Sequence, residues 1–226
     1  IADSGNIEVG LPTFTSALRG MAMVIVTIET LESPVHSGLF GGPAPDALMA
    51  LVTLLATLRD TNGDTTIDGV EGYEWVGAAY DEETYREQAG VLPGQPLIGT
   101  SSIGSMLYSL PAVSVVGIDA PAVEGAINAV VPQARAKVSL RVPPDADPVA
   151  AQQALVRHLE AHAPWGVQVR VEPGVTGAGF VADTSGPVYE AMWEAMHAAY
   201  DADPVEVGSG GSIPLVAVLR EVAPDA

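Results

Sequence analysis

The sequence contains no cysteine, so disulfide bonds and thiolate metal sites are excluded, and any metal would have to be bound by His, Asp or Glu. Basic residues are few: 9 Lys and Arg stand against 28 Asp and Glu, and the formal net charge is −19. This balance argues against nucleic acid and anionic membranes as partners, because both require clustered positive charge. The single lysine, Lys137, among many Ala, Gly and Val residues is typical of a GC-rich bacterial genome.

Long hydrophobic runs are also missing. No apolar stretch reaches the roughly 18–20 residues that a membrane helix needs, and no signal peptide is visible, so a cytoplasmic protein is expected. Hydrophobic residues nevertheless make up 48% of the 226 positions. This is enough for a sizeable core, in one domain or in two small ones.

Hydrophobic periodicity predicts the order strand, helix, strand, strand, helix, strand. The strands are expected at residues 18–32, 112–118, 134–142 and 167–171, with Pro173-Gly174 ending the last one. The helices are expected to begin at Asp46 and Asp147, the first with an apolar stripe made by Leu48, Leu51, Val52, Leu55 and Leu58, the second with a face made by Ala151, Leu155, Leu159 and His162. This order predicts an α+β fold: a ferredoxin-like, four-stranded antiparallel sheet with two helices on one face.

Other elements are expected outside this pattern. Residues 81–89 predict a short exposed helix, and residues 187–200 predict a helix with Val188, Met192, Ala195, Met196 and Ala199 on one side. A short strand at 205–207 then leads through glycines to a helix capped by Ser212. These last residues form a separate C-terminal α/β piece, with a domain boundary expected near residues 172–182.

Four histidines are candidates for chemistry. His36 lies between a predicted strand and a glycine-rich loop, where an imidazole could polarise a substrate or merely bond to nearby backbone. His158 and His162 share a helix face, a spacing that can bind zinc. The Glu that follows the first His in metalloprotease helices is Leu159 here, which favours a surface or core-edge pair. His197 is expected to be structural.

Two further segments could bind an anion. Gly208 to Gly211 precede a predicted helix, where bare N–H groups could cradle an anion or simply form a tight turn. Arg141 ends an apolar strand and could clamp a carboxylate bidentately, or be solvated.

Several segments, in order, resemble the dipeptidase branch of the carnosinase, aminoacylase and glutamate-carboxypeptidase family of two-metal peptidases. The most specific are Thr15-Ser16-Ala17-Leu18-Arg19-Gly20, His36-Ser37-Gly38-Leu39-Phe40-Gly41-Gly42 and Gly210-Gly211-Ser212-Ile213-Pro214. The similarity covers nearly the whole chain. It implies a catalytic domain into which a ferredoxin-like lid domain is inserted. Residues 1–17 would end the N-terminal catalytic segment, 18–174 would form the lid, and 175–226 would start the C-terminal catalytic segment.

The resemblance also implies roles for individual residues and a homodimer formed through the lid. Asp3 matches a zinc ligand, and His36 matches a lid histidine that crosses the dimer to stabilise the tetrahedral intermediate. Residues matched to substrate contacts are Asn128, Arg141, Gly210, Gly211 and Ser212. The family's other zinc ligands and its catalytic glutamate lie upstream of Asp3 or beyond residue 226.

The intact parent is therefore expected to be a zinc-dependent dipeptidase. It would hold two zinc ions and cleave dipeptides or N-acyl amino acids with a metal-activated water. The 226-residue chain alone is expected to be inactive, since it keeps one ligand of the set. The alternative is a non-catalytic, ferredoxin-like dimerisation or small-ligand-binding module.

Overall fold

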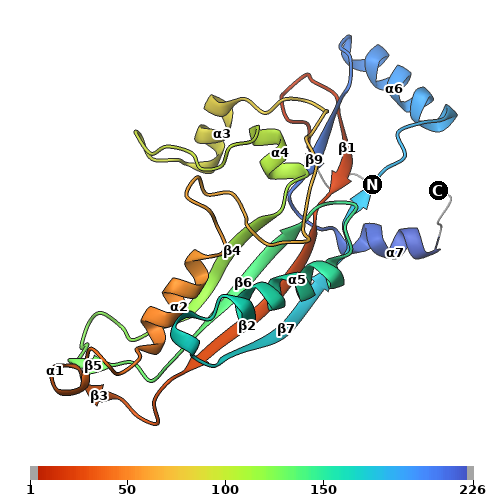
Figure 1. The fold of residues 1–226 in the computed structure, drawn as a ribbon. Helices are drawn as coiled ribbons and strands as arrows, with labels where there is room; N and C mark the ends of the chain where they lie inside the picture. The colour runs from red at the N-terminus through yellow and green to blue at the C-terminus, as the bar shows by residue number, and fades with distance from the viewer. Residues whose placement is uncertain (1–4, 223–226) are drawn as a thin grey trace.

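The computed structural model describes residues 5–222, and its largest element is a four-stranded sheet with the strand order β4-β6-β2-β7 (Figure 1). Its strands are β2 (Gly20–Glu29), β4 (Ala112–Asp119), β6 (Gln133–Val142) and β7 (Val169–Gly177), and every neighbouring pair is antiparallel. Alternate residues of β2 point to opposite faces, so Ala22, Val24, Val26 and Ile28 are all fully buried on one side. The predicted α+β sheet is confirmed.

Two helices cover this buried face, as expected (Figure 1). They are α2 (Ala47–Ala56) and α5 (Pro148–Ala161), and each begins directly after an aspartate. Asp46 accepts a hydrogen bond from the Met49 N–H at 3.0 Å, and Asp147 accepts one from Val149 at 2.8 Å. These bonds satisfy N–H groups that the first helical turn leaves free, which explains where both helices start.

The apolar stripe predicted for α2 is partly wrong. Leu51 and Leu58 are buried and Leu48 and Leu55 pack against the same core, but Val52 is 48% exposed, and the inward face also carries Ala47, Ala50 and Leu54. The two alanines let the helix approach the sheet closely, so this face turns inward.

The face predicted for α5 is correct at three positions. Ala151, Leu155 and Leu159 are buried, whereas His162 lies at the C-cap and is exposed.

Pro173-Gly174 does not end the last strand, contrary to expectation. β7 continues to Gly177, and Pro173 lies opposite Val24 where the β2–β7 register shifts. β7 is an edge strand, where a proline nitrogen can face away from the ladder. The side chain of Gln152, from α5, donates to Met23 O at 2.7 Å and to Gly174 O at 3.0 Å, which holds this irregular stretch.

A second, three-stranded sheet has the order β8-β1-β9. β1 (Thr13–Leu18) pairs parallel to β9 (Val205–Ser209) and antiparallel to β8 (Phe180–Val181). The strand expected at residues 18–32 is thus shorter, because Arg19 separates β1 from β2 at the junction of the two sheets. α7 (Pro214–Val222) follows β9.

α6 (Pro187–Tyr200) packs through a different face from the predicted one. Tyr189 and Trp193 contact Phe14, with ring centroids 5.1 and 5.9 Å apart. Val188 and Met192, which were expected on the packed side, are 74% and 51% exposed. Aromatic rings bury more area than aliphatic side chains, and here they decide the rotation of the helix.

The remaining elements lie in the long connections of the four-stranded sheet. They are β3 (Val35–His36), α1 (Ser37–Phe40), α3 (Glu82–Ala89), α4 (Ile103–Tyr108), β5 (Ala129–Val130) and a 3-10 turn at Pro164–Gly166. α3 confirms the expected short helix, and the others were not foreseen. Within residues 5–222, no helix combines the length and apolarity needed to cross a membrane.

Candidate functional site

His36 and Asn128 lie together in a small two-stranded ribbon made by β3 and β5. His36 pairs with Ala129, and the Ser37 N–H donates to Asn128 O at 2.9 Å. Both side chains are exposed. Residues about 90 positions apart in the sequence are therefore neighbours on one solvent-facing tip, at the lower left of Figure 1.

The ring of His36 is held by the start of α1. Its Nδ1 accepts a hydrogen bond from the Gly38 N–H at 3.1 Å. A Cβ at position 38 would lie 3.0 Å from His36 Cε1, so glycine is needed for this close approach. Because Nδ1 accepts, the neutral ring carries its proton on Nε2, which can donate a hydrogen bond outward.

Arg141 and Ser212 lie near the same row of paired residues in the four-stranded sheet, at the end opposite to the β3–β5 ribbon. Arg141 on β6 pairs with Met21 on β2, which in turn pairs with Gly177 on β7. A Cβ on Gly177 would be 3.6 Å from Ser212 Oγ, so the turn after β9 closes over this end of the sheet.

Arg19 connects this end to the glycine turn, although the sequence assigned it no role. Its backbone N–H donates to Ser209 O at 3.0 Å, and its Nη1 donates to Met106 O at 2.9 Å and to Leu110 O at 3.2 Å. A Cβ on Gly210 would lie 2.8 Å from Arg19 Nη2. The sequence signal for this role was an arginine placed between two apolar strands.

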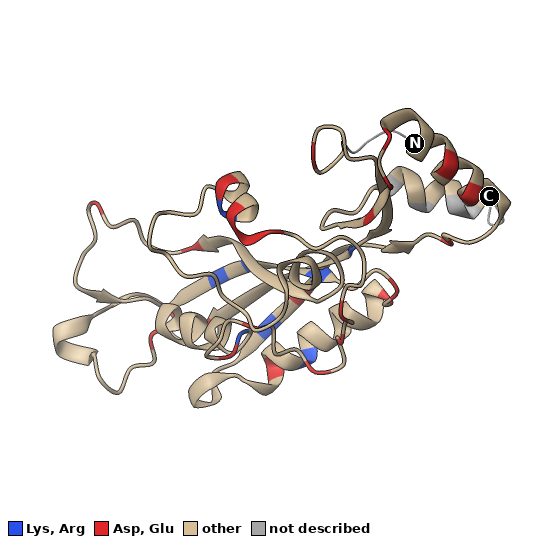
Figure 2. Cartoon of the chain, turned by 90° about the horizontal axis from the view of Figure 1, so that it is seen from above, with Lys and Arg blue, Asp and Glu red and all other residues tan. Residues whose placement is uncertain are grey.

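Two arginines make this end of the sheet electropositive. Burial and the nearby charge of Arg141 lower the pKa of Arg19 to about 10. No carboxylate of the described residues lies within ion-pair distance of either guanidinium. Figure 2 shows most acidic segments on helices and loops, while basic segments lie on the strands and on helices. A carboxylate ligand suits this end, because guanidinium groups bind carboxylates well.

The two groups of candidate residues are far apart within one chain. Arg141 lies opposite Met21 near the start of β2, whereas the ribbon of His36 and Asn128 lies beyond Glu29, at its end. At 3.3 Å per residue, the separation along β2 is about 25 Å. Figure 1 shows the ribbon and the β9–α7 turn at opposite ends of the molecule. One small substrate cannot touch both groups of the same copy.

No group of three or more His, Asp or Glu side chains is close enough to hold a metal ion anywhere in the described residues. Asp3, the ligand expected from the resemblance, lies outside them. The described part of the chain therefore does not fit a two-metal site.

The remaining histidines have local partners. His158 Nε2 lies 3.0 Å from Thr57 Oγ1, and its ring stacks on His162 at 4.1 Å. His158 is buried at the edge of the core. His197 is exposed, with Nδ1 3.0 Å from Asp203 Oδ1.

Comparison with known proteins gives consistent matches. A family model described as a peptidase dimerisation domain matches residues 16–167, more than half of the chain. A cysteinylglycine-S-conjugate dipeptidase from Corynebacterium striatum is 40% identical over 230 residues, which cover 100% of this chain and 50% of that protein. A Cys-Gly metallodipeptidase from Saccharomyces cerevisiae is 25% identical, covering 98% of this chain and 49% of that protein. The chain thus spans about half the length of the curated relatives it matches.

Solved structures agree with the fold. Human carnosine dipeptidase 1 matches with a TM-score of 0.75 and 24% identity, over 97% of this chain and 49% of that one. A dipeptidase from Saccharomyces cerevisiae matches with a TM-score of 0.76 and 24% identity, over 95% of this chain and 47% of that one.

Proposed function

The chain belongs to the M20 family of metallopeptidases, and from that premise we propose that it is the lid-bearing part of a zinc-dependent dipeptidase. The observation that carries this proposal is that the two groups of residues predicted to contact substrate lie at opposite ends of one sheet. The predicted lid, residues 18–174, supplies Arg141 at one end and His36 with Asn128 at the other.

The first group binds the substrate carboxylate. Arg141 is partly exposed, lies beside Arg19, and has no carboxylate partner among the described residues. Gly210, Gly211 and Ser212 form the adjoining turn, at the start of α7. A dipeptide or an N-acyl amino acid ends in a carboxylate that this end of the sheet can take. The relatives named as dipeptidases support the same substrate class.

The second group acts on a neighbouring copy. His36 and Asn128 are exposed on the β3–β5 ribbon, about 25 Å along the sheet from Arg141. The proton on His36 Nε2 can stabilise negative charge that develops on a substrate carbonyl oxygen. In a two-fold dimer, each ribbon would reach the carboxylate-binding end of its partner. The match to a peptidase dimerisation domain supports this arrangement.

Zinc would be bound by residues outside the described range 5–222. Asp3 is the one ligand candidate in this chain. The cytoplasmic location and the identity of the metal remain predictions.

Mixed dimers test the arrangement in the protein expressed from its complete reading frame. His36→Ala should lower turnover by about 10²–10³-fold, the usual effect of losing one oxyanion donor. Arg141→Ala should raise KM for dipeptides by about 10–100-fold, because a charged hydrogen bond is lost. A dimer of one His36→Ala copy and one Arg141→Ala copy contains one intact site, so co-refolding the two variants should restore activity.

Each variant refolded alone under the same conditions is the control. If the mixture is no more active than the average of the two controls, His36 does not act across subunits. A His36→Ala protein with normal turnover and a lower melting temperature would show that His36 is only structural.

A further inference from the structure

A cavity of about 850 Å³ lies beside the four-stranded sheet, enclosed mainly by residues 59–112. This volume is typical of small-molecule sites. Among the described residues, Arg19 alone lines the cavity from outside that segment. None of His36, Asn128, Arg141, Gly210, Gly211 or Ser212 lines it, so it is separate from the proposed substrate contacts.

Polar contacts hold the inner walls of the cavity in place. The Asp64 carboxylate accepts hydrogen bonds from the Thr100 N–H and from Thr100 Oγ1, the latter at 2.7 Å. Arg59 donates to the carbonyl oxygens of Gly63 and Val113.

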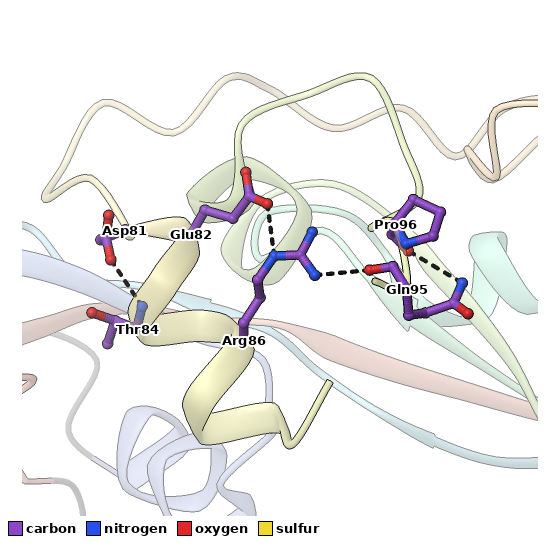
Figure 3. Close-up of polar contacts among 6 residues, drawn as sticks. All are labelled: Asp81, Glu82, Thr84, Arg86, Gln95 and Pro96. Atoms are coloured by element: carbon purple, nitrogen blue, oxygen red, sulfur yellow. Dashed lines mark hydrogen bonds and ion pairs between the residues drawn. The ribbon is translucent and has the colours of Figure 1, made fainter. Parts of the chain in front are cut away.

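The outer wall is tied to α3. Arg86 bonds to Glu82 and, through Nη1, donates to Gln95 O at 2.8 Å, while Asp81 caps the helix at Thr84 (Figure 3). Gln95 and its neighbour Pro96 line the cavity. The walls are therefore fastened to one another by hydrogen bonds, and the space is preformed.

Unpartnered polar atoms gather at this cavity. Within the described residues, three buried side-chain polar atoms lack a hydrogen-bond partner, and two of them, Arg19 Nε and Thr65 Oγ1, belong to lining residues. Arg19 is only 6% exposed. A buried donor without an acceptor is unfavourable by about 1–3 kcal/mol. A negative charge bound next to Arg19 would pair with a buried guanidinium that has no acidic partner among the described residues.

The charges around the cavity favour an anion at Arg19. No described carboxylate pairs with Arg19 or Arg59, which bond only to backbone carbonyl oxygens. Among the acidic lining residues, Asp64 is engaged by Thr100, and Asp68 and Glu71 are exposed. The rest of the wall is largely apolar, and includes Ile98, Met106 and Leu110.

We propose that this cavity binds a small carboxylic acid with an apolar body. Its carboxylate lies beside the guanidinium of Arg19, and its chain lies against Ile98 and Met106. Arg19 also lies against the Gly210 turn, so a ligand bound in the cavity would affect the position of this turn, at the edge of the end proposed to bind substrate. The site itself does not depend on peptide cleavage.

Titration calorimetry with sodium hexanoate tests this site in the protein expressed from its complete reading frame. Hexanoate should bind saturably below about 10 mM, and hexanamide, which lacks the charge, at least tenfold more weakly. Arg19→Gln should weaken hexanoate binding by about tenfold or more. Ile98→Trp, at a 54% exposed wall position, should crowd the apolar wall and weaken binding.

Two matched variants complete the test. Arg170→Gln removes an exposed arginine of β7, and Arg141→Ala removes the proposed substrate arginine. Both should bind hexanoate as the wild type does. Loss of binding in Arg141→Ala would place hexanoate at the substrate site and overturn the proposal. Absence of wild-type binding, equal binding of hexanamide, or full binding by folded Ile98→Trp would overturn it as well.

Discussion

At the scale of single residues, Arg19 organises the junction between the two sheets. It separates β1 from β2, and its guanidinium bonds to carbonyl oxygens at the end of α4. These carbonyls belong to a helix terminus that would otherwise leave acceptors free. The same guanidinium lies against the glycine turn, which explains why position 210 has no side chain.

Gly210→Ala should destabilise the protein, whereas Gly211→Ala should not. A Cβ at position 210 would lie 2.8 Å from Arg19 Nη2 and 3.3 Å from Leu107 O, but one at position 211 meets only Ser209 Oγ at 3.8 Å. Overpacking of this kind lowers the free energy of unfolding by about 1–3 kcal/mol. Urea denaturation of both variants measures the difference. Equal stability of the two would show that Arg19 moves aside freely.

At the scale of secondary-structure elements, the helices are fixed to the sheet by a few buried polar contacts as well as by apolar packing. Gln152 of α5 reaches the irregular stretch between β2 and β7, and Thr57 at the end of α2 bonds to His158 of α5. Both contacts lie where regular structure is interrupted, so they supply bonds that the sheet and the helices leave unmade.

Gln152→Ala should lower the free energy of unfolding by about 1–3 kcal/mol, because two bonds from a buried amide to backbone carbonyls are lost. Gln152 is 8% exposed, and the adjacent Gln153 is exposed. Gln153→Ala is therefore the matched control and should leave stability unchanged within about 0.5 kcal/mol. If both substitutions have the same effect, the bonds to Met23 and Gly174 do not stabilise the edge strand.

Acidification should weaken the contact between α2 and α5. Burial and the neighbouring His162 lower the pKa of His158 below 6.5, its ordinary value. The folded state then binds fewer protons than the unfolded state as the pH falls through 6.5. The stability due to neutral His158 is complete above that pH and is lost below it.

Melting temperatures measured between pH 5 and pH 7.5 check this dependence. His158→Gln should flatten the profile, because it removes the group whose pKa is lowered by burial. An unchanged profile in His158→Gln would show that other groups cause the pH dependence.

At the scale of the whole molecule, the four-stranded sheet has two open edges. β4 and β7 are the outer strands of the four-stranded sheet. β4 exposes Val115, Val116 and Ile118, at 47%, 55% and 47%. An open apolar edge requires cover, and a two-fold pairing of identical edges supplies it.

Sedimentation should therefore detect a dimer. Val116→Lys on β4 should weaken it markedly, whereas Val175→Lys, on the opposite edge strand β7, should not. The reverse pattern would place the dimer contact on β7. A monomer at high protein concentration would contradict pairing through either edge.

The isolated 226-residue chain should not hydrolyse dipeptides and should bind zinc weakly. The described residues contain no cluster of metal-binding side chains, and Asp3 is the single candidate ligand. Activity assays with and without a chelator, together with metal analysis after gel filtration, measure both properties. Chelator-sensitive hydrolysis by the purified chain would show that this part is sufficient.

The sequence by itself determined the kind and order of the main elements. Periodicity gave the alternation of strands and helices, and Asp46 and Asp147 marked the starts of α2 and α5. These features depend on residues within a few positions of each other, which is the range over which hydrogen-bonded turns and side-chain periodicity act. The glycine-rich loop after His36 was likewise visible in the local sequence.

Tertiary structure alone decided which faces pack and which distant residues meet. The rotation of α2 and α6 depends on shapes supplied by the sheet and by Phe14. The meeting of His36 with Asn128, and of Arg19 with Gly210, requires a particular register between segments some 90 to 190 residues apart. Such contacts form only after long loops close, and local preference carries no information about their register.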